Sequence, residues 1–212
     1  LTLSGANTYT GTTTISAGTL VAASNTAMGT TAAGTTVTSG ATLALQGGIT
    51  VGAETLSLNG TGVGTNGALR NLSGNNAWGG TVTLAGTTEI QSDAGMLTLG
   101  AANSVTGTNR ALTIDGAGNT TINGTITTGT GALTKNGTGT LTLSGANTYT
   151  GTTTINAGTM RYGANNAIAS GAVVVNNGGT YDLNNFSDTI GALTVNSGTT
   201  GGAVTTGTGT LT

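Results

Sequence analysis

The sequence contains no cysteine, no proline and no histidine, and only 5% of its residues are charged. Without cysteine there can be neither a disulfide nor a thiolate metal site. Without histidine, the usual general base near neutral pH and the commonest metal ligand are both missing. The absence of proline suits strands that donate backbone hydrogen bonds within a sheet. We therefore predict that the chain is not an enzyme and holds no cofactor and no metal.

Positive charge is equally scarce, since the chain has only four Lys and Arg residues. They are scattered, at Arg70, Arg110, Lys135 and Arg161, and form no basic cluster that could neutralise phosphates. No apolar run approaches the ~20 residues of a membrane-spanning helix. We therefore expect no nucleic-acid partner and no membrane span in this segment.

What the sequence does contain is a regular alternation of apolar residues with Thr, Ser or Ala. This period of two is the strand period, and β-branched Thr suits a pleated surface. No window of a dozen residues shows a helical stripe. The pairs that carry the alternation include Leu1 and Leu3, Leu43 and Leu45, Leu56 and Leu58, Leu97 and Leu99, Leu112 and Ile114, and Val173 and Val175. The chain is therefore predicted to be ordered and all-β.

A long repeat organises the chain. Residues 1–20, LTLSGANTYTGTTTISAGTL, recur at 141–160 as LTLSGANTYTGTTTINAGTM. A degenerate copy, LSGNNAWGGTVTL, begins at Leu72, so that the motif's Leu stands at positions 3, 72 and 143. These spacings predict one continuous segment of three units, 1–70, 71–140 and 141–212.

A unit of about 70 residues is too long for one turn of a β-solenoid but would accommodate three turns of about 23. We therefore predict an all-β fold, a parallel β-solenoid (β-helix) of about nine turns. A sandwich or barrel of short strands is the competing fold, and the recurrence of one motif in each unit argues against it.

The stretch GALTKNGTGTLTLSGANTYTGTTTINAGTM, residues 131–160, resembles the autotransporter-associated β-strand repeat, also called the passenger-associated transport repeat. The resemblance is close at 1–20 as well and degenerate at 67–84. It implies a right-handed parallel β-helix in a bacterial autotransporter passenger or a related giant surface protein, exposed outside the cell. It implies no catalysis.

One aromatic position recurs in the motif, as Tyr9, Trp78 and Tyr149. Such rings could form a periodic platform for a glycan, or they could pack over the corners of the coils, which is the interpretation we favour. The turn residues that accompany them are Asn7, Asn76, Asn147, Gly11, Gly80 and Gly151.

The close carboxylate pairs are Glu89 with Asp93 and Asp182 with Asp188. A glycoside hydrolase needs two carboxylates about 5–9.5 Å apart across a cleft. Few helping side chains surround these pairs, so a polysaccharide-cleaving enzyme is only the third hypothesis. Alternation with Ile90 places Glu89 on the outer surface.

Two further ligand hypotheses are weaker. Asp115 with Asn119, and Asp182 after two glycines, resemble calcium-binding turns but lack the G-G-x-G-x-D string. Thr-x-Thr sites could form an ice-binding surface, yet they recur only once in about three predicted turns.

The function predicted from these features is an extracellular structural rod, a segment of a bacterial surface fibre or adhesin stalk. The alternative is a glycan-binding adhesin module that uses Tyr9, Trp78 and Tyr149. Neither end of the sequence shows a capping turn, so we expect further copies or continuing repeats, head to tail, as partners, with surface glycans as additional partners. The expected location is extracellular or on the bacterial cell surface.

Overall fold

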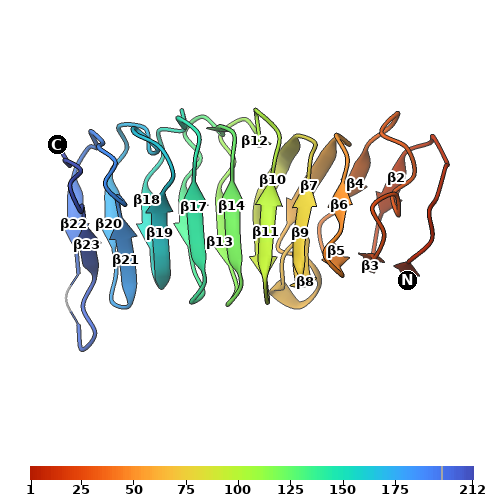
Figure 1. Ribbon diagram of the computed structural model, residues 1–212, viewed down its shortest axis with the longest axis horizontal. Helices are drawn as coiled ribbons and strands as arrows, with labels where there is room; N and C mark the ends of the chain where they lie inside the picture. The colour runs from red at the N-terminus through yellow and green to blue at the C-terminus, as the bar shows by residue number, and fades with distance from the viewer. Residues whose placement is uncertain (197) are drawn as a thin grey trace.

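The computed structural model of the chain describes residues 1–196 and 198–212. They form a parallel β-solenoid of about ten turns, whose coils stack along one axis with the two termini at opposite ends (Figure 1). The predicted all-β parallel solenoid is thereby confirmed. Because successive strands pair in parallel, every coil presents its inward side chains directly above those of the coil before it.

The strands stack in three ladders. The first ladder contains β1 (Thr2–Leu3), β3 (Gly18–Ala22), β5 (Ala41–Gln46), β8 (Leu69–Ser73), the C-terminal part of β10 (Val82–Ser92), β13 (Leu112–Asp115), β16 (Leu133–Lys135), β18 (Thr153–Ile155), β20 (Val173–Val175) and β22 (Leu193–Val195). The second ladder contains β2 (Thr13–Ile15), β4 (Thr35–Val37), β7 (Leu56–Gly60), the N-terminal part of β10, β12 (Val105–Thr106) and β15 (Ile126–Thr127). The third ladder contains β6 (Thr50–Val51), β9 (Asn75–Trp78), β11 (Met96–Leu99), β14 (Asn119–Ile122), β17 (Thr140–Leu143), β19 (Gly158–Tyr162), β21 (Gly179–Asp182) and β23 (Ala203–Thr205).

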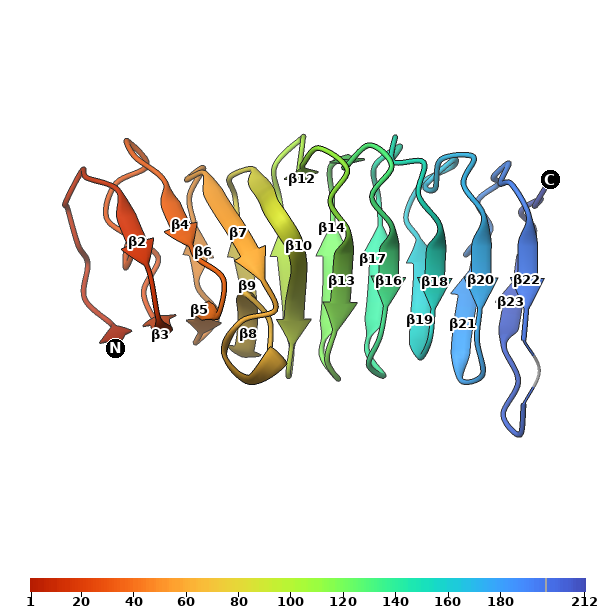
Figure 2. The same cartoon turned by 180° about the vertical axis from the view of Figure 1, so that it is seen from behind.

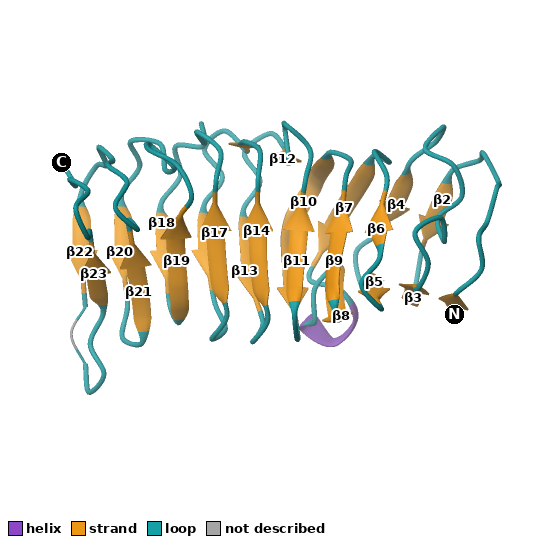
Figure 3. Cartoon of the chain, in the orientation of Figure 1, coloured by secondary structure: helices purple, strands orange, loops and turns teal. Residues whose placement is uncertain are grey.

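The first and second ladders join into one sheet because β10 runs through both (Figure 2). A single turn of 3-10 helix, η1 (Val63–Thr65), lies beside β8 and is the purple segment of Figure 3. Beyond β15, loops connect the third ladder to the first along the upper edge of Figure 3, so the later coils are built on two strands rather than three.

Coil length varies along the solenoid and explains the number of turns. Leu69 pairs with Leu43, whereas Ile155 pairs with Lys135 and Val175 with Ile155. The first of these pairings encloses a longer stretch of sequence than either of the other two. The shorter C-terminal coils raise the number of turns to about ten, compared with the nine predicted from coils of uniform length.

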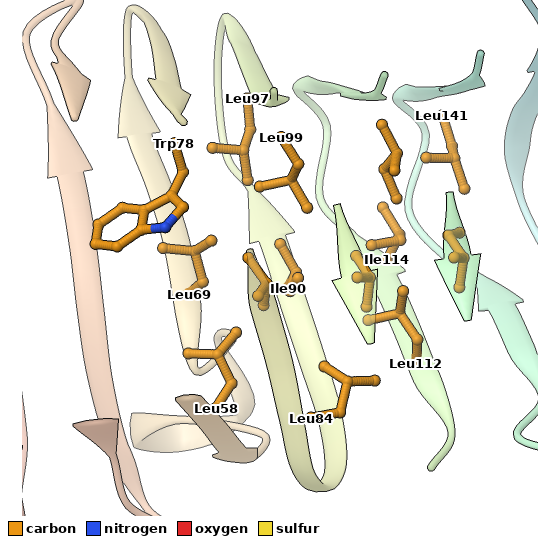
Figure 4. Packing of buried hydrophobic residues seen from close by; sticks show 14 of the residues in the cluster. Leu58, Leu69, Trp78, Leu84, Ile90, Leu97, Leu99, Leu112, Ile114 and Leu141 are labelled. Atoms are coloured by element: carbon orange, nitrogen blue, oxygen red, sulfur yellow. The ribbon is translucent and has the colours of Figure 1, made fainter. Parts of the chain in front are cut away.

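The core is a thin column of apolar side chains between the sheets. In β13 Leu112 and Ile114 are buried, whereas Thr113 and Asp115 are only partly buried, as the strand period requires. Figure 4 shows Leu and Ile side chains of successive coils at equivalent positions, with the ring of Trp78 beside them. Burying such a side chain contributes about 1.5–3 kcal/mol, so each coil is stabilised mainly by its neighbours.

The two near-identical copies do not occupy equivalent places in the solenoid. Ile15 pairs through Val37 and Leu58 to Leu84 in the second ladder, which makes the first interval three whole turns. The corresponding residue of the later copy, Ile155, lies instead in the first ladder. The coils between the second and third copies are shorter. An interval of similar length therefore covers three turns and the further distance to the next ladder, which places Ile155 in the first ladder.

Candidate functional site

The three aromatic residues of the motif lie in different environments. Trp78 and Tyr149 are 0% exposed, whereas Tyr9 is 39% exposed. Trp78 belongs to the third ladder and donates its Nε1–H to the carbonyl of Glu54, at 2.8 Å. The three rings therefore do not form a single exposed row, which a glycan platform of periodic rings would need.

Tyr9 and Tyr149 nevertheless share one local geometry. The hydroxyl of Tyr9 is hydrogen bonded to Thr13 Oγ1, and that of Tyr149 to Thr153 Oγ1, both at 2.7 Å. Burial raises the pKa of Tyr149 above its usual value, so this phenol stays protonated. The local sequence thus sets the Tyr–Thr pair, and the surrounding coils set its exposure.

The turn asparagines connect neighbouring coils. Asn7 Nδ2 donates to the carbonyl of Ala27 at 2.8 Å. Asn76 accepts from the Ile49 amide at 2.7 Å and Asn147 from the Ile126 amide at 2.6 Å. Each side chain satisfies a backbone group that has no strand partner at a corner of the coil.

The turn glycines differ in the space that a side chain would have at each position. A Cβ built on Gly80 would lie 1.7 Å from the Glu54 carbonyl oxygen, and one on Gly151 would lie 2.3 Å from that of Gly131. Nothing lies within 4 Å of the same position on Gly11. Close stacking of coils therefore requires glycine at 80 and 151 but not at 11.

An asparagine ladder, absent from the sequence-based prediction, runs along the outer face at the end of the first ladder. It is formed by Asn136, Asn156, Asn176 and Asn196, in which each Nδ2 donates to the Oδ1 of the asparagine one coil earlier at 2.6–2.8 Å. The sequence signal for it is the constant interval of 20 residues between successive members. Such chains of amides polarise one another and fix the register of parallel strands.

Lys135, which directly precedes the first asparagine of this ladder, is the least expected core residue. Its side chain takes the inward position between Ile114 and Ile155 and is 2% exposed. The ammonium donates to the carbonyls of Asn136 and Gly137, the latter at 2.8 Å. Burial lowers the pKa of Lys135 from 10.5 to about 8, and the negative charge of Asp115 partly opposes this effect.

A second buried polar group joins Tyr162, Tyr181 and Asp188 near the C-terminal coils. The Tyr162 hydroxyl contacts the Tyr181 hydroxyl and donates to Asp188 Oδ2, which also accepts from the Ile168 amide at 3.1 Å. The two rings meet edge to face with centroids 5.5 Å apart. Burial raises the pKa of both tyrosines, so their phenols stay protonated.

A cleft of about 520 Å³ opens on the N-terminal coils, where loops precede the first strands of the third ladder. Its lining comes from three successive coils and consists of Ala6, Asn7, Thr8, Asn25, Thr26, Gly29, Thr30, Thr31, Val51, Gly52 and Glu54. Glu54 is 2% exposed, and burial raises the pKa of its carboxyl group although a hydrogen bond from Thr35 opposes the shift. Unlike the hollow at the end of the first coil, which Leu1, Leu3 and Leu20 line, this cleft contains a buried acid.

The comparison with known families gives one result. Residues 1–22 and 133–161 match the family model of the passenger-associated-transport-repeat. The predicted resemblance of the two strong copies is confirmed, and the degenerate copy at 67–84 lies outside the matched residues. No curated protein and no solved structure matches the chain.

The passenger-associated transport repeat belongs to autotransporter passengers, which are secreted. The second matched segment contains the buried Lys135, the ladder residue Asn156 and the buried Tyr149. This segment therefore places one inward charge, the two ladder amides of Asn136 and Asn156, and one corner aromatic within neighbouring coils.

The three aspartates considered for catalysis are bonded to other residues. Asp93 forms a salt bridge with Arg70 at 2.7 Å and Asp182 one with Arg161 at 3.3 Å. Glu89 is 9% exposed and its Oε1 has no partner among the described residues, although alternation had placed it on the outer surface. Burial, and then the charge of Asp115, raise the pKa of Glu89.

The residues considered for calcium also bond within the protein. Asp115 Oδ1 accepts from the Gly116 amide, and Asn119 Oδ1 accepts from the Thr140 amide at 2.9 Å. In the part of the chain that the structure describes, no helix is both long and apolar enough to cross a membrane.

Proposed function

We propose that this chain is a segment of an extracellular structural rod, part of a bacterial surface fibre or adhesin stalk. The matched repeat and the solenoid fold fit a structural segment of an autotransporter-type passenger. The observation that carries the proposal is the unbroken first ladder, which runs through ten strands from β1 to β22.

The physical properties of the ladder suit such a role. Each described coil is stabilised by its neighbours through parallel hydrogen bonds and the apolar column. In the C-terminal half the asparagine ladder adds further hydrogen bonds between coils. The chain has only four Lys and Arg residues for trypsin-like proteases to recognise. The proposal includes no catalytic step, because the aspartates of both carboxylate pairs are held in ion pairs or in the buried tyrosine group.

The proposed partners are further coils that stack on the described ones. Leu193 and Val195 of β22 are 41% and 45% exposed, whereas Val173 and Val175, their partners in β20, are buried. A following coil, from the same chain or from another copy, would bury these side chains and pair the outer edge of β22.

The location is tested by immunogold electron microscopy of intact cells of the source bacterium, with antibodies raised against the 212-residue chain. Gold on the outside of unpermeabilised cells is the expected result. An antibody against a cytoplasmic protein serves as the control for cell integrity. Labelling that appears only after permeabilisation would contradict the proposal.

A further inference from the structure

The cleft beside β6 has a fixed floor. The Glu54 amide donates to the carbonyl of Gly52 at 2.8 Å, and the Glu54 carbonyl accepts from Trp78 Nε1 at 2.8 Å. Thr35 donates its hydroxyl to Glu54 Oε1 at 2.5 Å, while Oε2 accepts no hydrogen bond from the described residues. The backbone and one oxygen are held, and one acceptor of a nearly buried carboxylate remains unused.

The surface of the cleft is mostly apolar, with Asn and Thr residues among its lining, and it carries no positive charge. Asn25 uses its Oδ1 to accept from the Thr50 amide at 2.8 Å, which leaves its amide N–H groups for a ligand. Thr26, Thr30 and Thr31 belong to the lining, and Val51 supplies part of its apolar surface. With Glu54 as the single acid and neither Lys nor Arg in the lining, the cleft disfavours anions such as phosphate or acidic sugars.

An aromatic ring packs beside the cleft, next to one of the lining residues but outside the lining itself. Tyr9 lies directly against Gly29 of the lining, where an added Cβ would be 3.0 Å from both Cδ2 and Cε2 of the ring. The Thr30 amide donates to the Tyr9 carbonyl at 2.9 Å and fixes this loop relative to the cleft. A partly exposed ring supplies a flat apolar face beside polar groups, which suits a ligand that is apolar on one face and hydroxylated at its edges.

We propose that this cleft binds an uncharged saccharide, with Glu54 and the threonine hydroxyls bonding its hydroxyl groups, the apolar surface of the cleft contacting its C–H faces, and Tyr9 contacting a sugar unit that extends beyond the cleft. The volume of about 520 Å³ falls within the range of ordinary ligand pockets. Single sites of this kind, unlike a periodic row of rings, need only one exposed aromatic. The site is independent of the extracellular-rod proposal, because a rod without any ligand would have the same coils.

The test is titration of the 212-residue chain, labelled with ¹⁵N, with maltotriose, mannotriose and N,N′,N″-triacetylchitotriose at millimolar concentration, and with sialyllactose as an anionic probe. We expect at least one neutral trisaccharide to shift the amide signals of Asn25, Thr31 and Val51, and sialyllactose to leave them unchanged. The proposal is overturned if all three neutral sugars leave these signals in place, or if sialyllactose binds as well as they do.

Two variants locate the binding. Glu54→Gln keeps the acceptor for Thr35, and Thr31→Val removes one hydroxyl at nearly constant volume; each is expected to weaken binding by about tenfold. Thr142→Val, on β17 far along the solenoid, and Glu89→Gln, at the other buried glutamate, are the matched controls and should bind as the unmodified chain does. Circular dichroism checks folding. Unchanged affinity in both cleft variants would refute the assignment.

Discussion

The amide of Asn176 donates to the side-chain oxygen of Asn156 at 2.6 Å, and Asn156 in turn donates to Asn136 at 2.8 Å. Asn156 is also one of the two positions at which the near-identical copies differ, since the first copy has Ser16 there. Ser16 follows the second-ladder strand β2, whose partner β4 is followed by Thr38 rather than by an asparagine. The difference between the copies therefore matches the ladder in which each one lies.

Exchanging these two residues should have unequal effects. Asn156→Ser removes two amide hydrogen bonds and is expected to destabilise the chain by about 1–2 kcal/mol. Ser16→Asn, the matched control on an exposed corner, should change stability by less than about 0.5 kcal/mol. Urea unfolding followed by circular dichroism measures both. Equal effects of the two substitutions would argue against the asparagine ladder as a stabilising element.

Alanine at the turn glycines should separate close coil contacts from open corners. Gly80→Ala places a Cβ against the carbonyl of Glu54 and is expected to cost about 3 kcal/mol or more, because backbone atoms cannot move aside. Gly11→Ala meets nothing and should stabilise the chain by up to about 1 kcal/mol, since alanine restricts the unfolded chain. Thermal melting provides the comparison, and a tolerated alanine at 80 would show that the coils can separate there.

The two tyrosine hydroxyls offer a second matched pair. Tyr149→Phe leaves the buried hydroxyl of Thr153 without its partner, at an expected cost of about 1–3 kcal/mol. Tyr9→Phe leaves Thr13 in contact with water and should change stability by less than about 0.5 kcal/mol. Denaturant midpoints of the two variants decide the matter, and the prediction fails if Tyr9→Phe is the more damaging.

Lys135 should make stability depend on pH in the alkaline range. Its pKa is about 8 in the folded chain and near 10.5 when exposed, so the unfolded state binds more protons between these values. The free energy of unfolding should therefore rise as the pH increases from 8 towards 10, and below pH 8 the buried charge is a constant cost.

Lys135→Met, which keeps an unbranched side chain in the column, should abolish that rise. Above about pH 10 the buried tyrosines act in the opposite direction in both proteins, because their raised pKa values make the unfolded state release protons first. Denaturant titrations at several pH values give the difference between the two proteins. Parallel pH profiles would contradict the burial of the ammonium.

Much of the fold follows from local sequence. The alternation of Leu112 and Ile114 with polar residues predicts a strand buried on one face, and the recurrence of the motif predicts stacked coils; both are found. The equivalent positions of Ile15 and Leu84, three turns apart in the second ladder, also follow from aligning the copies. These properties depend on side-chain period and on repeat length, which one sequence displays directly.

The candidate sites were less predictable. Tyr9 and Tyr149 have the same neighbours in sequence, yet only Tyr149 is covered by adjoining coils. Alternation with Leu133 puts Lys135 on the inward face of its strand, whereas the charge of a lysine favours the outer face, and only the structure decides between them. Glu54 lies between two short strands, and only the stacking of three coils brings it beside Asn25 and Thr31 in one cleft.

The sequence by itself thus determined the strand period, the solenoid class and the local Tyr–Thr contacts, because these depend on side-chain period and on the residues of a single turn. The tertiary structure alone decided which ladder each copy occupies. The ladder of each copy depends on the total length of the coils that precede it, and these coil lengths differ along the solenoid. A small difference in that total moves the same sequence to a different side of the solenoid. The burial or exposure of each side chain, and the cleft at Glu54, follow from how the coils stack.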